Sequence, residues 1–109
     1  MTYVFDIDGT ICSPSSNGDY SDAMPFVSRI KYINLLYDGG HEIVFYTARG
    51  MGRTNNDRKK AEKIFSKLTT EQLDQWGVKY NKLYFGKPSG DLYVDDKGMF
   101  DTSFFGWRG

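Results

Sequence analysis

The chain has 109 residues, its 14 basic and 14 acidic side chains cancel, and 17% of its residues are aromatic. This length suits one domain with one modest core over residues 1–109, and the charge balance gives no support to a protein that coats nucleic acid or a membrane surface. One cysteine, Cys12, excludes an internal disulfide and agrees with a reducing compartment. Because neither a membrane-spanning stretch nor a secretion signal is expected, the sequence predicts a cytoplasmic protein without a membrane partner.

Strands and helices alternate in the first half of the sequence. A short apolar strand is expected at 2–5, followed by a polar loop at 12–24. A helix is expected to begin at Pro25, to carry apolar residues at helical spacing, and to end at a pair of glycines. The run EIVFYT at 42–47 predicts a second strand, after which comes a loop with two arginines and two glycines.

The second half continues the alternation. A charged helix is expected from about 57 to 68, with RKKAEK as its solvated face, and a separate short helix begins at Thr69 with a capping box. Two further short strands are expected at 82–85 and 91–96. This order predicts a doubly wound α/β fold, Rossmann-like, with three α/β/α layers around a central, mainly parallel sheet.

Pairs of acidic residues lie at the ends of the first and last predicted strands. Asp6 and Asp8 follow one apolar run, and Asp95 and Asp96 end another. The carboxyl ends of parallel strands meet at one edge of a sheet, where four carboxylates require a compensating cation. Oxygen ligands without a His/Cys cluster favour Mg²⁺, which leaves positions open for a phosphate. Surface turns and helix caps would explain a single pair of acids, but two pairs at strand ends favour the metal.

Three further residues supply what a phosphate group would need. Thr47 ends the second predicted strand and has a hydroxyl that can donate a hydrogen bond. Lys87 and Arg49 each come shortly after a predicted strand and carry a positive charge. Each is weak evidence alone, because Thr is ordinary at a strand end and Gly-Lys-Pro is an ordinary turn. Their order along the chain, with an acid pair before them and another after them, is more informative.

That ordered set resembles the haloacid dehalogenase (HAD) superfamily of phosphohydrolases. DIDGT at 6–10 is similar to its first motif, Thr47 to its second, Lys87 to its third, and VDD at 94–96 to its fourth. More narrowly, TARGM, TNN and LYFGKPSGDLYVDDK resemble the short HAD phosphatases of capsular and other surface-polysaccharide biosynthesis.

The resemblance implies a role for each acidic residue. Asp6 would be the nucleophile that becomes an aspartyl-phosphate, and Asp8 would protonate the leaving oxygen and then activate water. Asp6 and Asp95 would bind Mg²⁺, as would Asp8 through its backbone carbonyl, and Asp96 would help directly or through a water.

It also implies contacts with the phosphoryl group and the substrate. Thr47 and Lys87 would orient the phosphoryl group and the nucleophile, although Lys87 lies only eight residues before Asp95, which leaves no room for an intervening helix. Gly9 and Thr10 would present backbone N–H groups to the phosphate. The substrate- or phosphate-binding residues implied are Gly9, Thr10, Ala48, Arg49 and Arg53.

The spacing of the motifs bears on the substrate. Gaps of 38 residues between Asp8 and Thr47, and of 39 between Thr47 and Lys87, leave no room for a cap domain. The open site would suit a large substrate or a homo-oligomer that covers it, with 12–24 as a mobile flap. A sugar phosphate or related surface-polysaccharide precursor is expected as the substrate.

Two alternatives stay open. In the first, the substrate is a nucleotide or a polynucleotide end, which the neutral charge disfavours; in the second, the protein is a phospho-acceptor or Mg²⁺-binding regulatory module without turnover. Cys12 is interpreted as a small packed thiol.

Overall fold

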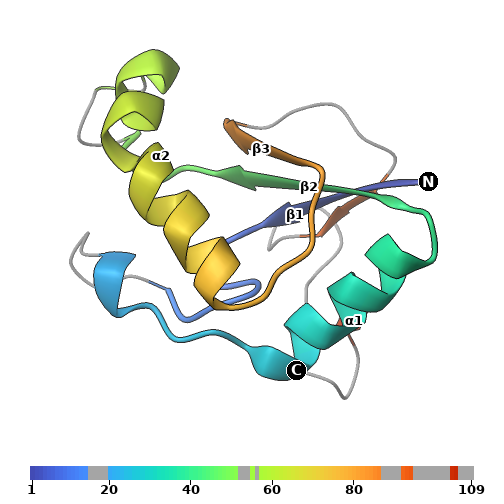
Figure 1. Ribbon diagram of the computed structural model, residues 1–109. Helices are drawn as coiled ribbons and strands as arrows, with labels where there is room; N and C mark the ends of the chain where they lie inside the picture. The colour runs from blue at the N-terminus through green and yellow to red at the C-terminus, as the bar shows by residue number, and fades with distance from the viewer. Residues whose placement is uncertain (15–19, 52–54, 56, 87–91, 95–103, 106–109) are drawn as a thin grey trace.

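The computed structural model describes most of the chain, namely residues 1–14, 20–51, 55, 57–86, 92–94 and 104–105. Four parallel strands form its central sheet in the order β3-β2-β1-β4 (Figure 1). The strands are β1 (Thr2–Asp6), β2 (Glu42–Thr47), β3 (Lys82–Phe85) and β4 (Leu92–Val94). Their aromatic and β-branched residues suit strands of a buried parallel sheet. The predicted strands are therefore confirmed, with the ends of the last one outside the described residues.

Two α-helices in the described residues connect the strands, α1 (Val27–Asp38) and α2 (Arg58–Gln75). The chain moves from β1 to β2 to β3 in one direction across the sheet, and right-handed connections then place both helices on the same face (Figure 1). Ile30 and Ile33 of α1 and Leu73 of α2 indeed join one core cluster. The α/β class with a parallel sheet and no cap domain is confirmed for this part of the chain. Any layer on the opposite face lies outside the described residues.

Helix α2 differs from the prediction, because it is one continuous helix where two were expected. Thr69 does not cap a new helix; its hydroxyl is buried and accepts a hydrogen bond from another segment. The next hydroxyl, on Thr70, donates to the Ser66 carbonyl at 2.9 Å, which is compatible with an unbroken helix. The true N-cap is Asp57, whose carboxylate accepts from the Lys60 N–H at 3.1 Å.

The main core cluster is rich in aromatic rings between the sheet and the helices. Phe5 of β1 lies 5.9 Å from Phe45 of β2 and 6.1 Å from Phe105, measured between ring centroids. Two apolar helix residues lie outside this core and are exposed, Val27 at 58% and Ile64 at 54%. The core is therefore built from the strands, the inner rows of the two helices and the Phe104–Phe105 pair.

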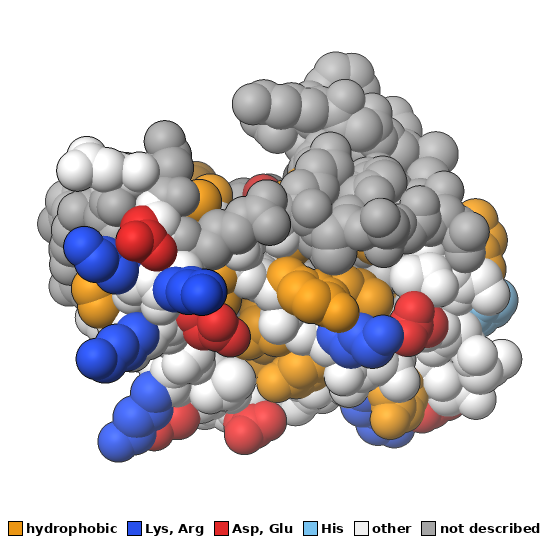
Figure 2. All heavy atoms as spheres, turned by 90° about the horizontal axis from the view of Figure 1, so that it is seen from above, with side chains coloured by type: hydrophobic (Ala, Val, Ile, Leu, Met, Phe, Trp, Pro, Cys, Tyr) orange, Lys and Arg blue, Asp and Glu red, His pale blue; other side chains and the backbone are white. Residues whose placement is uncertain are grey.

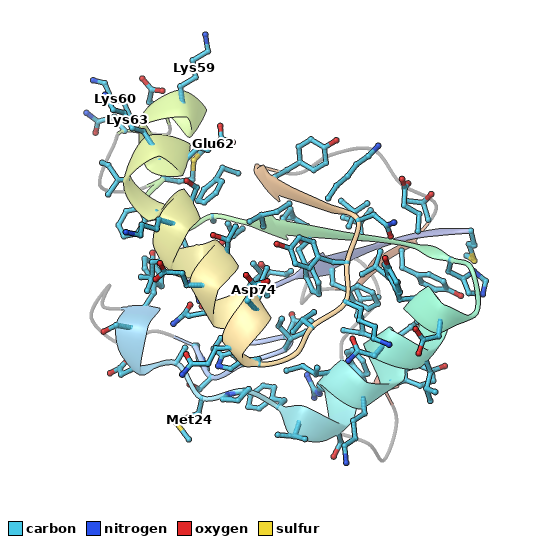
Figure 3. All side chains as sticks on the ribbon, in the orientation of Figure 1. Met24, Lys59, Lys60, Glu62, Lys63 and Asp74 are labelled. Carbon is cyan, nitrogen blue, oxygen red and sulfur yellow. The ribbon has the colours of Figure 1, made fainter. Side chains whose placement is uncertain are left out.

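Charged residues of the described surface are mixed in sign. Lys59, Lys60 and Lys63 extend from the first turns of α2 into solvent beside Glu62 (Figure 3). Figure 2 likewise shows basic and acidic side chains interspersed on the face in view, around exposed apolar side chains. No helix within the described ranges is both long and apolar enough to cross a bilayer.

Gly50, in the loop after β2, provides a test of how closely α2 packs on that loop. Its φ is +78°, and an added Cβ would lie 2.5 Å from the Phe65 ring of α2. Gly77 is a matched control, because its φ is +72° and a Cβ there would meet nothing within 4 Å. Gly77→Ala should cost about 1 kcal/mol of unfolding free energy, and Gly50→Ala about 1–3 kcal/mol more. Urea unfolding of both variants measures the difference, and equal losses would contradict the packing.

Candidate active site

The end of β1 places Asp6 at the carboxyl edge of the sheet, beside the end of β2. The strand register pairs Asp6 with Tyr46, so Thr47 lies one residue beyond that pair. The Asp6 carboxylate is partly buried, and its Oδ1 accepts a hydrogen bond of 2.8 Å from the Ile7 N–H. The sequence thus correctly placed Asp6 and Thr47 at the same edge.

The turn after β1 is closed by its own backbone. Gly9 has a φ of +84° and donates from its N–H to the Cys12 carbonyl at 2.9 Å, and Thr10 donates to the Ile7 carbonyl at 3.1 Å. Both N–H groups are therefore engaged inside the turn, and their contact with a phosphate stays a prediction. Thr10 is also only 3% exposed, and its carbonyl accepts from Arg29 Nη1 at 2.9 Å.

Asp8 forms a two-point ion pair with Arg49, which lies two residues after the end of β2. Arg49 Nε donates to Asp8 Oδ2 and Arg49 Nη2 donates to Asp8 Oδ1, each at 2.9 Å. The Arg49 side chain is 0% exposed and that of Asp8 is 21% exposed. This fork geometry fixes both oxygens of the carboxylate at once.

The remaining contacts of the Arg49 guanidinium come from α2 and from the loop before α1. Its Nη1 donates to Thr69 Oγ1 at 3.2 Å and to Gln72 Oε1. The Tyr20 ring lies against it, with 4.8 Å between the ring centroid and Cζ. Gln72 also donates to the Tyr20 carbonyl at 2.6 Å, so Tyr20 and α2 are tied together. We call Asp8, Tyr20, Thr69 and Gln72 the guanidinium shell.

Burial of Arg49 corrects one expectation from the sequence. A guanidinium that is 0% exposed and bonded to three side chains does not offer its donors to a substrate. Thr47 is buried as well, and its Oγ1 accepts from the Arg49 N–H at 3.0 Å. Ala48, between them, is exposed. Of these three residues, Ala48 is therefore the one whose side chain faces solvent.

Several predicted site residues lie outside the described part of the chain: Arg53, Lys87, Asp95 and Asp96. Within the described part, no group of three or more His, Cys, Asp or Glu side chains could hold a metal ion. Asp6 contributes a carboxylate at the sheet edge, but both oxygens of Asp8 are already bound by Arg49. The described residues fit a metal only as part of a larger set, with Asp8 limited to its backbone carbonyl.

Sequence reasoning missed the guanidinium shell. The three-residue spacing of Thr69 and Gln72 fits the predicted capping box, but it also places both on one helix face next to the buried Leu73. Polar residues on a buried helix face need partners, and that requirement was the available signal. Nothing in the spacing of Tyr20 indicated that its ring would cover an arginine.

Comparison with known proteins shows likeness in structure. A target protein from Vibrio cholerae has a TM-score of 0.79 and 28% sequence identity, over 97% of this chain and 89% of that chain. A D,D-heptose 1,7-bisphosphate phosphatase from B. bronchiseptica, in complex with magnesium and phosphate, has a TM-score of 0.54 and 14% identity. That likeness covers 83% of this chain and 51% of the phosphatase, so this chain spans about half its length. No protein-family model and no curated protein matches the sequence.

These comparisons support the expected fold. An α/β fold like that of the B. bronchiseptica phosphatase is shown for this chain, and its described residues contain no cap domain. The narrower resemblance to surface-polysaccharide phosphatases stays a prediction.

Cys12 lies against the candidate site, in contact with Asp8. It is 0% exposed, and its Sγ lies 3.6 Å from both the Ile7 carbonyl and Asp8 Oδ1. Burial, with Asp8 nearby, raises the pKa of the thiol from 9.0 to about 12. We expect iodoacetamide at pH 8 to label the native chain about 100-fold more slowly than the urea-unfolded chain.

The same pKa has a consequence for stability. Between pH 9 and 12 the thiol of the unfolded chain is ionised, whereas the thiol of the folded chain stays protonated. Because the unfolded state then binds fewer protons, the free energy of unfolding should fall as the pH rises through this range. Rapid labelling of the native chain would contradict the packed position of Cys12.

Proposed function

We propose that the chain is a Mg²⁺-dependent phosphomonoesterase that works through an aspartyl-phosphate on Asp6. The observation that carries the proposal is that two carboxylates at one sheet edge have different hydrogen-bond partners. Asp6 Oδ1 accepts from the adjacent Ile7 N–H, whereas both oxygens of Asp8 accept from a buried arginine. Two acids with different surroundings and only one residue between them suit a division into nucleophile and proton carrier. The likeness in fold to a phosphatase supports the same chemistry.

The proposed reaction has two steps at phosphorus. In the first, an Asp6 oxygen forms a bond to phosphorus while the bond to the ester oxygen breaks, and the departing oxygen takes the proton that Asp8 carries at the start of this step. In the second, a water attacks the phosphorus and gives its proton to Asp8, while the bond from phosphorus to Asp6 breaks. The products are the alcohol and inorganic phosphate, and both aspartates return to their starting forms.

The metal and the remaining ligands belong to the proposal. When bound, Mg²⁺ would offset the negative charge that gathers on the phosphoryl oxygens. Asp6, the Asp8 carbonyl, Asp95 and Asp96 would hold it, and Thr47 and Lys87 would orient the phosphoryl group. Asp6 fits this role by its place at the sheet edge.

A sugar phosphate or related surface-polysaccharide precursor is the substrate class that we propose. A site without a cap would admit a bulky polyhydroxylated group, and the B. bronchiseptica phosphatase takes its name from a heptose bisphosphate. The mixed surface charge in Figure 2 gives less support to a polynucleotide. A second subunit covering the site and a cytoplasmic location are part of the same proposal.

The test is release of phosphate by the purified chain. We expect turnover of p-nitrophenyl phosphate with Mg²⁺ and loss of it in EDTA. Asp6→Asn should lower kcat by about 10³-fold or more, because the attacking oxygen is replaced by an amide. Asp38→Asn, which changes an exposed carboxylate in a surface ion pair, should leave kcat unchanged.

A panel of phosphomonoesters separates the alternatives within that experiment. Preference for hexose and heptose phosphates supports the proposal, and preference for nucleotides or 3′-phosphate ends would replace the substrate class. A long-lived phosphoprotein without turnover would overturn the enzyme in favour of a phospho-acceptor module. Full activity of Asp6→Asn would overturn the mechanism.

A further inference from the structure

Arg49 has contacts that neither of its simplest roles explains. It is not placed to bind substrate, because its side chain is 0% exposed. Stability alone is also a poor explanation, since a buried ion pair is often no more stabilising than apolar side chains of similar volume. Another role must therefore account for the buried guanidinium of Arg49.

The orientation of Asp8 indicates that role. Nε and Nη2 of Arg49 bond the two oxygens of Asp8 separately, at 2.9 Å each, so the plane of the carboxylate follows the plane of the guanidinium. The Asp8 side chain keeps 21% of its surface exposed, so it is accessible as well as fixed. A lysine could neutralise the charge, but it could not define this plane.

The rest of the guanidinium shell holds Arg49 itself. Thr69 Oγ1 and Gln72 Oε1 accept from Nη1, the guanidinium nitrogen that does not bond Asp8, and the Tyr20 ring lies against the guanidinium. Thr69 and Gln72 belong to an 18-residue helix, which is a rigid support. Through Arg49, helix α2 therefore helps to fix the orientation of the Asp8 carboxylate.

From these contacts we infer that Arg49 is a positioning residue, which holds Asp8 in the orientation needed for proton transfer to and from the reacting oxygens. This inference rests on the proposed phosphatase function. Arg49 touches neither substrate nor phosphorus, and acts through Asp8. Its loss should therefore weaken the proton transfer without weakening the binding of substrate.

Leaving groups of different basicity make this role measurable. p-Nitrophenolate departs without a proton, whereas the alkoxide of glycerol 2-phosphate needs one. The value of kcat/KM reports events up to departure of the leaving group, and so isolates the proton donated by Asp8. In Arg49→Lys we expect kcat/KM to fall about 100-fold for glycerol 2-phosphate and less than about 10-fold for p-nitrophenyl phosphate, because general acid catalysis contributes about 10²–10⁴.

Arg49→Lys should also slow the second step, in which Asp8 takes a proton from water. We expect a burst of p-nitrophenol equal to the enzyme concentration, followed by slow turnover. The apparent substrate dissociation constant, from single-turnover kinetics, should stay within about threefold of the wild type, because Arg49 does not touch the substrate.

Three variants serve as comparisons. Asp8→Asn should show the same preference for the aryl substrate, which links the effect to Asp8. Lys79→Met removes an exposed surface ion pair with Asp38, and should leave kcat/KM unchanged for both esters. Thr69→Val keeps Arg49 but removes one acceptor of its guanidinium, and should show the same selective loss at about fivefold. Thr69→Val also keeps the test possible if Arg49→Lys does not fold.

The outcomes distinguish this inference from the proposed function. If the wild type releases no phosphate from either ester, the proposed function fails. If Asp8→Asn shows the leaving-group effect and the folded Arg49→Lys and Thr69→Val variants do not, the function survives and the positioning role is wrong. A raised substrate dissociation constant with an equal loss for both esters would instead assign Arg49 to substrate binding, and would overturn the inference.

Discussion

The ion pair between Asp8 and Arg49 is the interaction on which the site depends. A guanidinium that is 0% exposed needs hydrogen-bond partners inside the protein, and both oxygens of Asp8 accept from it. The pair joins the turn after β1 to the loop after β2, and the contacts of Arg49 with Thr69 and Gln72 add α2. Three segments that are far apart in the sequence are therefore held together by one side chain.

This interaction also explains why Asp6 and Asp8 differ despite their closeness. The Asp6 carboxylate ends a strand and accepts from the adjacent backbone, whereas Asp8 lies in a turn that faces Arg49. The parallel sheet brings the ends of β1 and β2 to one edge, and in the turn that contains Gly9 the second acid contacts Arg49. Unequal roles for the two acids are thus compatible with the backbone as well as with the side chains.

The sequence allowed the sheet and the edge of the site to be predicted, but not the contacts within it. Strands such as 42–47 were identified because β-branched and aromatic runs have a local pattern. The position of Asp6 next to Thr47 followed from parallel topology. The break expected at Thr69 was wrong, because a capping box and a buried polar pair share the same spacing. The guanidinium shell depends on which faces of α2 and the 20–22 segment meet the loop after β2, and that is a tertiary property.

A double-mutant cycle on unfolding free energy tests most directly whether Asp8 and Arg49 are one unit. Asp8→Asn and Arg49→Met would each leave a partner unpaired, whereas the double variant leaves no buried charge at this position. We expect the double variant to be more stable than the sum of the single losses predicts, with a coupling of about 2 kcal/mol. A coupling near zero, with additive losses, would contradict the central claim that this pair organises the site.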